Sequence, residues 1–387
     1  MQLLVVLLVF VSLLPSAYTS ISTIAEIDEV LLNISFHALM TKPRETAIVS
    51  PFSIALALAT VNLGAKEKTS QEITDVVFRG LSRGEVISWF QDKLPRLKGE
   101  NSPWSVASAL YHEKTMNVIT KYYDGVKEDL KSDVEHVDFK STPQAQRTLI
   151  NSLVNSTTAG RIPELLNQDH VTADTKLIAM NALYLKTKIS TGNTSERLFN
   201  RDNGSTIPDK TTNDITNGRF FENDDYVYGD FPFDEEHQPF RFYIIVPKSR
   251  SLSTITDQLL IDVIRNSSAL NFGEHYAVPS PLRFTIPKLS QITSEFDVSE
   301  ILRSMGVVAL FDANLKGISD VQLFAERFVH KATIELNENG VTASTATGAS
   351  FGSSPHILPK QREFHGNRPF LFGIVHGLIP MFLGHYY

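Results

Sequence analysis

The residue pattern with the most direct chemical meaning is Gly80-Leu81-Ser82-Arg83-Gly84, which matches the G-x-S-x-G pattern of a nucleophilic serine. Such a serine needs a strand before it and a helix directly after it, so that its hydroxyl is exposed on a sharp turn. The preceding residues, Ser70 to Phe78, instead carry apolar side chains at helical spacing. We therefore interpret the pattern as a surface turn, and we expect no catalytic residues and no enzyme activity.

Metal and cofactor motifs are also missing. His112-Glu113 lacks the second histidine of a zinc-binding H-E-x-x-H helix, and the chain contains no cysteine. The sequence has no phosphate-binding loop and no dinucleotide-binding fingerprint. We expect no metal site and no cofactor.

The charge balance disfavours nucleic-acid binding, because the net charge is -7 and the isoelectric point is near 5.9. Five basic residues are spaced through one region: Arg79, Arg83, Lys93, Arg96 and Lys98. They could contact a polyanion such as a glycosaminoglycan. Acidic and apolar residues interrupt them, however, so a solvated face is the favoured interpretation.

One stretch near the C-terminus is unusual in composition. Residues 340–350 are uncharged, small and free of proline. They separate an apolar-patterned region ending at Leu336 from an apolar C-terminal segment, so they must bridge two parts of one core. Their threonines and Val341 accept strand geometry, and no side chain is too large to enter a sheet. The stretch therefore predicts a mobile exposed loop that can become a strand.

The elements around this loop can be read from periodicity. Thr23 and Glu26 form a capping box before a helix with one buried face, and Ser50 caps a helix that runs from Pro51 to Gly64. Apolar runs predict strands over 177–185, 240–246 and 282–286 and a buried hairpin over 370–375 and 381–383. Because helices crowd the first half and strands the second, we expect a single α+β domain.

The first residues predict entry into the secretory route. Residues 3–14 are almost wholly apolar and are followed by small residues, which is typical of a signal peptide over residues 1–20. No later segment is long and apolar enough for a membrane span. Five glycosylation sequons agree with a secreted, extracellular glycoprotein: Asn33, Asn155, Asn193, Asn203 and Asn266.

Several blocks of this sequence, in order, resemble the serpin family. The resemblance covers essentially all of residues 21–387, the predicted serpin domain. The blocks are Val49-Ser50-Pro51-Phe52-Ser53-Ile54, Asn181-Ala182-Leu183-Tyr184-Leu185-Lys186, Val329-His330-Lys331-Ala332, Glu335-Leu336-Asn337-Glu338-Asn339-Gly340 and Asn367-Arg368-Pro369-Phe370-Leu371-Phe372. Two tryptophan positions common in the family are replaced, one by Leu153 and one within Thr187-Lys188-Ile189.

The resemblance implies a single α+β domain with a large central sheet, surrounding helices and a reactive-centre loop over about 338–364. Inhibitory serpins are suicide substrates. A serine or, in some cases, cysteine protease forms an acyl-enzyme with the loop, and the cut loop inserts into the sheet. The resemblance assigns the inserting hinge to Glu338, Gly340, Val341, Thr342, Ala343, Ser344, Thr345, Ala346 and Thr347. It assigns a polar shutter beneath the opening sheet to Ser50, Ser53, Asn181 and His330. We expect a monomer whose partner is the target protease.

The resemblance gives more than one position for the reactive bond. The family's usual spacing from Glu338 places the bond at Ser354-Pro355, although proline after the bond disfavours cleavage. A shifted count gives His356-Ile357 or Ile357-Leu358. The alternative function is a non-inhibitory serpin that acts as a carrier, chaperone or storage protein. The uncharged hinge favours a secreted inhibitor.

Overall fold

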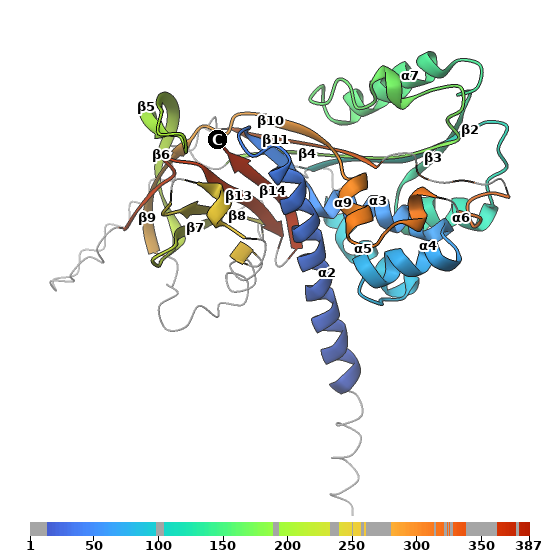
Figure 1. Cartoon of the computed structure of the whole chain (residues 1–387), viewed down its shortest axis with the longest axis horizontal. Coiled ribbons are helices and arrows are strands. Elements are labelled where there is room, and N and C mark those ends of the chain that lie inside the picture. The colour runs from blue at the N-terminus through green and yellow to red at the C-terminus, as the bar shows by residue number, and fades with distance from the viewer. Residues whose placement is uncertain are drawn as a thin grey trace, which may run out of the picture.

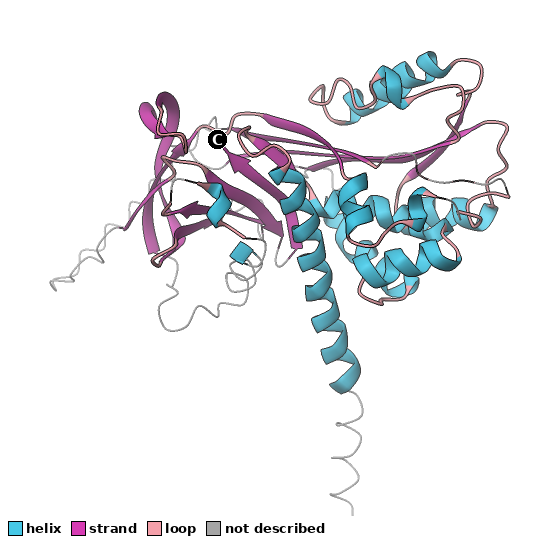
Figure 2. Ribbon diagram, in the orientation of Figure 1, coloured by secondary structure: helices cyan, strands magenta, loops and turns pink. Residues whose placement is uncertain are grey.

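The computed structural model describes residues 14–97, 104–188, 193–232, 240–249, 251–256, 259–260, 280–312, 315–320, 323, 325, 328–337, 362–376 and 379–387. These residues form two β-sheets with helices packed around them (Figures 1 and 2). Helices dominate the first part of the chain and strands the second, as the sequence predicts. The α+β class is confirmed.

The first sheet has five strands in the order β10-β11-β4-β2-β3. Their bounds are β10 Ile292–Asp297, β11 Val329–Asn337, β4 Leu177–Lys188, β2 Trp104–Glu113 and β3 Asp133–Val137. The two central strands, β11 and β4, are parallel and directly paired from Lys331 opposite Ala182 to Asn337 opposite Lys188. Strands β10 and β2 flank this pair in antiparallel orientation.

The second sheet follows the order β1-β14-β13-β8-β7-β6-β9-β12, with β5 also paired to β6. Its strands are β1 Ala47–Val49, β5 Asn193–Asn200, β6 Thr206–Glu222, β7 Tyr226–Pro232, β8 Phe240–Pro247, β9 Ser280–Pro287, β12 Arg362–His365, β13 Phe370–His376 and β14 Ile379–Tyr386. Strands β13 and β14 form the antiparallel terminal hairpin that the sequence predicts. Rings from several strands, such as Phe231 and Phe364, meet within this sheet.

Helices cover both faces of the five-stranded sheet. Helix α7 (Pro143–Thr157) crosses one face, and the larger helical group lies on the other (Figure 1). Other α-helices whose bounds the structure describes are α2 Leu14–Met40, α3 Pro51–Gly64, α4 Glu67–Glu72, α5 Arg83–Leu97, α6 Thr120–Asp124 and α9 Ser299–Ser304. Under α7, Ile150 and Val154 pack on Ala107, Ala109 and other residues of the sheet. The small side chains of Ala107 and Ala109 let the helix lie close to the strands.

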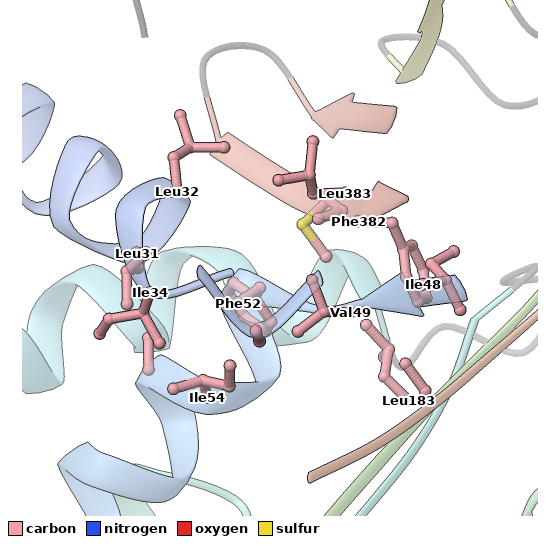
Figure 3. Packing of buried hydrophobic residues seen from close by; sticks show 14 of the residues in the cluster. Leu31, Leu32, Ile34, Ile48, Val49, Phe52, Ile54, Leu183, Phe382 and Leu383 are labelled. Carbon is pink, nitrogen blue, oxygen red and sulfur yellow. The ribbon is translucent and has the colours of Figure 1, made fainter. Parts of the chain in front are cut away.

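Helix α3 lies at the centre of the main core. It starts as predicted, because Ser50 Oγ accepts the Ser53 N–H at 3.1 Å and Pro51 occupies the first helical position. Nearly every residue of the helix is buried. Figure 3 shows Phe52 and Ile54 of this helix among Leu183 of β4 and Leu383 of β14. The shared core fixes the terminal hairpin, the helix and the five-stranded sheet against one another.

Two predicted boundaries are wrong. The N-terminal helix α2 starts at Leu14 rather than after a capping box at Thr23, which therefore lies inside the helix. The predicted loop 338–364 is too long at its C-terminal end, since residues 362–364 belong to β12 and pair in parallel with β9. Phe364 is fully buried there among core aromatic residues, and this burial holds the end of the loop in the second sheet.

Candidate functional site

Residues 338–361 connect the two sheets, because β11 ends at Asn337 and β12 begins at Arg362. All of the predicted hinge residues lie in this connection, outside the described residues. The same holds for the predicted reactive bonds at Ser354-Pro355 and His356-Ile357. The described structure therefore bears on the sheet next to the loop rather than on the loop itself.

The polarity of β11 and β4 determines what could fit between them. A segment that follows β11 and turns back would run antiparallel to β11 and, because β4 is parallel to β11, antiparallel to β4 as well. Its insertion would replace one parallel ladder with two antiparallel ladders. Such a strand would also separate β11 from β4 by about 9.6 Å instead of about 4.8 Å. In the described structure the two strands are paired, so the sheet is closed.

A buried polar cluster lies beneath this seam, and we call Ser50, Ser53 and His330 the shutter cluster. The Ser50 N–H donates to His330 Nε2 at 2.9 Å, and Ser50 Oγ donates to the Met381 carbonyl at 2.8 Å. These bonds link the start of α3 to β11 and to the terminal hairpin. The structure thus brings together three of the four predicted shutter residues; Asn181 lies on adjacent β4, but its side chain is outside the described residues.

The environment of His330 holds its ring neutral. The side chain is 2% exposed, and burial lowers the pKa of His330 to about 3. The bond from the Ser50 N–H requires an unprotonated Nε2, which agrees with a neutral ring. Because charging this ring would remove an acceptor and bury a cation, the cluster is coupled to protonation.

A second polar cluster spans the same seam near the end of β11. The sequence did not predict it. We call Glu335, Tyr184, Arg161 and Lys186 the clasp. Glu335 is 7% exposed and accepts a bond from the Tyr184 hydroxyl of β4 at 2.9 Å. Arg161 Nε lies 2.7 Å from the same carboxylate, and Lys186 Nζ lies 3.9 Å from its other oxygen. The clasp joins β11, β4 and the segment after α7.

The segment after α7 is fastened both to α7 itself and to β11. Asn151 Oδ1 accepts the backbone N–H groups of Leu165 and Leu166, each at 2.9 Å, and its amide donates to the Leu166 carbonyl. Lys331 of β11 donates to the Glu164 carbonyl and contacts Glu295 of β10 at 3.2 Å. Lys331 thus ties β11 to this segment on one side and to β10 on the other, directly beside the seam.

Ser82 does not form a catalytic elbow. Its backbone N–H and hydroxyl both donate to Glu85 Oε2, at 2.8 and 2.7 Å, as in a helix-capping turn before α5. Gly80 has a φ of 81° in that turn. The interpretation of the pattern as a surface turn is confirmed.

The basic region described in the sequence is partly directed into the protein. The Arg83 guanidinium donates to the Ala65 carbonyl and, at 2.7 Å, to Ser70 Oγ. Lys93 pairs with the neighbouring carboxylate of Asp92. Arg79 is exposed, while the side chains of Arg96 and Lys98 lie outside the described residues. Glycosaminoglycan binding stays a prediction.

The sequons occupy different surroundings. Asn203 is exposed in the turn between β5 and β6, where its side-chain oxygen accepts the Ser205 N–H at 2.9 Å. Asn33 is half-buried within α2, and Asn155 is half-buried near the end of α7. Asn193 begins β5, and Asn266 lies outside the described residues. Of Asn33, Asn155 and Asn203, only Asn203 is exposed.

Comparisons with known proteins agree with the fold and with the order of the motifs. The model of the family described as "Serpin (serine protease inhibitor)" matches residues 29–387. Human Serpin B12 is 28% identical over 371 residues, covering 84% of this chain and 89% of that protein. Leukocyte elastase inhibitor from Bos taurus is 28% identical over 361 residues, covering 86% and 90%.

Comparison with solved structures shows the same fold. The structure of uncleaved ovalbumin has a TM-score of 0.77 at 25% identity, over 92% of this chain and 97% of that one. The structure of Arabidopsis AtSerpin1 in its native stressed conformation has a TM-score of 0.78 at 21% identity, over 94% and 97%. The fold and the closed sheet define a protein of the serpin class. By the extent of the family match, this chain belongs to the serpin family.

Proposed function

We propose that this protein is a secreted serine protease inhibitor that acts as a suicide substrate. The observation that carries the proposal is the directly paired, parallel β11–β4 seam, with the loop-bearing connection beginning where β11 ends. Cleavage within residues 338–361 would free the segment after β11 to turn back into this seam. The attached protease would then be carried along the sheet as an acyl-enzyme.

The hinge sequence supports insertion over a carrier, chaperone or storage role. Residues 341–347 are valine, alanine, serine and threonine, and none carries a charge. One face of a strand between β11 and β4 would lie against the main core, which already buries Leu183 of β4 and Ala332 of β11. Alternate side chains must therefore be buried, which small uncharged residues tolerate. A relative named as an elastase inhibitor adds support for protease inhibition.

The test is incubation with a panel of serine proteases, followed by denaturing electrophoresis. We expect a denaturant-resistant complex with at least one protease, and mass spectrometry of the released C-terminal peptide identifies the cut bond. Thr345→Arg should be cleaved at the same bond but form little complex, because a charge would have to enter the sheet. Ordinary cleavage across the whole panel, without complex, would instead support the non-inhibitory alternative.

Secretion is supported by the leader-like residues 1–20 and by the five sequons. Among the described residues, no helix is long and apolar enough to cross a membrane. Expression in a eukaryotic secretory host tests this part of the proposal. We expect protein in the medium that loses mass with an N-glycosidase, and Asn203→Gln should remove one glycan. Retention of unmodified protein inside the cells would overturn it.

A further inference from the structure

Two histidines face each other at the end of the five-stranded sheet that is far from the loop. His112 of β2 and His136 of β3 are register partners in the parallel pair, so their side chains leave the same face of the sheet. Their ring centroids are 6.3 Å apart with an interplanar angle of 46°. His112 is half-buried and His136 is exposed. The shutter cluster and the clasp use neither residue.

The hydrogen bond of His112 prepares one ring nitrogen for a metal ion. His112 Nδ1 lies 3.1 Å from the Glu113 carbonyl oxygen, which can only accept, so Nδ1 carries the proton. In the neutral ring the lone pair is then on Nε2. A histidine whose other nitrogen donates to a carbonyl is the usual arrangement of a metal ligand.

The separation of the rings suits a shared ion. With a nitrogen–metal distance of about 2.1 Å, two ring centres on one ion lie about 5.2 Å apart at a tetrahedral angle and about 6.4 Å apart in a linear arrangement. The observed 6.3 Å is within this range. A change of about 1 Å, obtained by rotating the exposed His136 side chain, gives tetrahedral geometry.

The described residues contain no group of three or more histidine, cysteine, aspartate or glutamate side chains with metal-binding geometry. The remaining coordination positions would therefore be filled by water or by an external ligand.

We propose that His112 and His136 form a two-histidine surface site for a divalent transition-metal ion of the Zn²⁺ and Cu²⁺ class. Imidazole nitrogens suit these ions, and Cu²⁺ binds such ligands more tightly than Zn²⁺. An ion held there joins β2 to the edge strand β3. The sequence shows no metal-binding motif here because the two ligands come from separate strands, β2 and β3, which only the fold brings together. The site is independent of protease inhibition.

The test is calorimetric titration of the full chain, without an affinity tag, with Zn²⁺. We expect one saturable equivalent, and we expect His136→Gln to weaken it by at least about tenfold, as for loss of a metal ligand or its support. The matched control is His37→Gln, which changes another exposed histidine, in α2, and should bind as the wild type does.

A spectroscopic measurement makes the assignment specific. One equivalent of Cu²⁺ should give an electron paramagnetic resonance spectrum with coupling to two imidazole nitrogens, reduced to one in His136→Gln. Because His136 is exposed, this variant should fold, so the test does not depend on the half-buried His112. The proposal is overturned if the wild type shows no saturable binding, or if His136→Gln binds with unchanged affinity.

Discussion

At the scale of single residues, His330 is the clearest link between chemistry and conformation. Its neutral ring accepts the Ser50 N–H beneath the seam, and the protonated ring could not. His330 belongs to β11, which borders the seam, so its bond to Ser50 holds that strand in place. Its protonation should therefore affect the stability of the closed sheet.

The pH dependence follows from the lowered pKa. The unfolded histidine has a pKa near 6.5, whereas in the folded protein burial lowers the pKa of His330 to about 3. Between these values the unfolded chain binds more protons, so this contribution to stability is complete above pH 6.5 and declines on acidification. The slope is at most about 1.4 kcal/mol per pH unit.

A variant isolates this contribution. At pH 7.5, His330→Leu should be less stable by roughly 1–3 kcal/mol, because the Ser50 N–H loses its acceptor. The difference from wild type should shrink between pH 6.5 and 4, since only the wild type has the buried histidine to charge. Denaturant unfolding across this pH range measures it. His385→Leu is measured alongside it, because burial also lowers the pKa of His385, to about 4. This second variant shows how much of the pH dependence of the wild type comes from His385. A difference from wild type that does not vary with pH would contradict the account of His330.

Residue chemistry also shows where sequence analysis succeeds. Ser50 was predictable because a cap followed by proline is a local signal, and the structure confirms it. Glu335 offered a weaker signal, a lone acid at the end of an apolar strand. Its partners Tyr184 and Arg161 come from distant segments, so no local pattern could pair them. For the same reason, the burial of Phe364 in β12 could not be read from the sequence.

At the scale of elements, the clasp holds β11, β4 and the segment after α7 together. Separating the strands to about 9.6 Å would break the bond between Tyr184 and Glu335, which now measures 2.9 Å. The carboxylate is nearly buried, so a lost partner is not freely replaced by water. The clasp therefore opposes opening of the seam.

Tyr184→Phe should lower the barrier to opening without changing the packing of the ring. A hydrogen bond to a charged group contributes about 1.5–3 kcal/mol, so we expect conversion of the uncut protein to inserted or polymeric forms to accelerate at least about tenfold. Native gel electrophoresis during incubation at fixed temperature measures the rate. The matched control is Tyr123→Phe, which removes a hydroxyl that contacts Lys127. Equal rates in the two variants would contradict a role for the clasp.

At the scale of the whole molecule, cleavage within residues 338–361 should make the closed sheet less stable than a sheet with the hinge inserted. Insertion of ten residues, from Glu338 to Thr347, would exchange one parallel ladder for two antiparallel ladders. The net gain is on the order of ten hydrogen bonds at about 1 kcal/mol each. Because the chain is large, this corresponds to a rise in melting temperature on the order of 10 °C or more.

Differential scanning calorimetry before and after limited proteolysis within residues 338–361 measures this rise. Thr345→Arg provides the control, since cleavage of the same bond should raise its melting temperature much less when a guanidinium would have to be buried. The comparison separates insertion from simple loss of the loop, because both proteins are cut at the same bond. An equal melting temperature for cut and uncut wild-type protein would mean that the seam between β11 and β4 stays closed after cleavage, and the trapping mechanism would then have no source of energy.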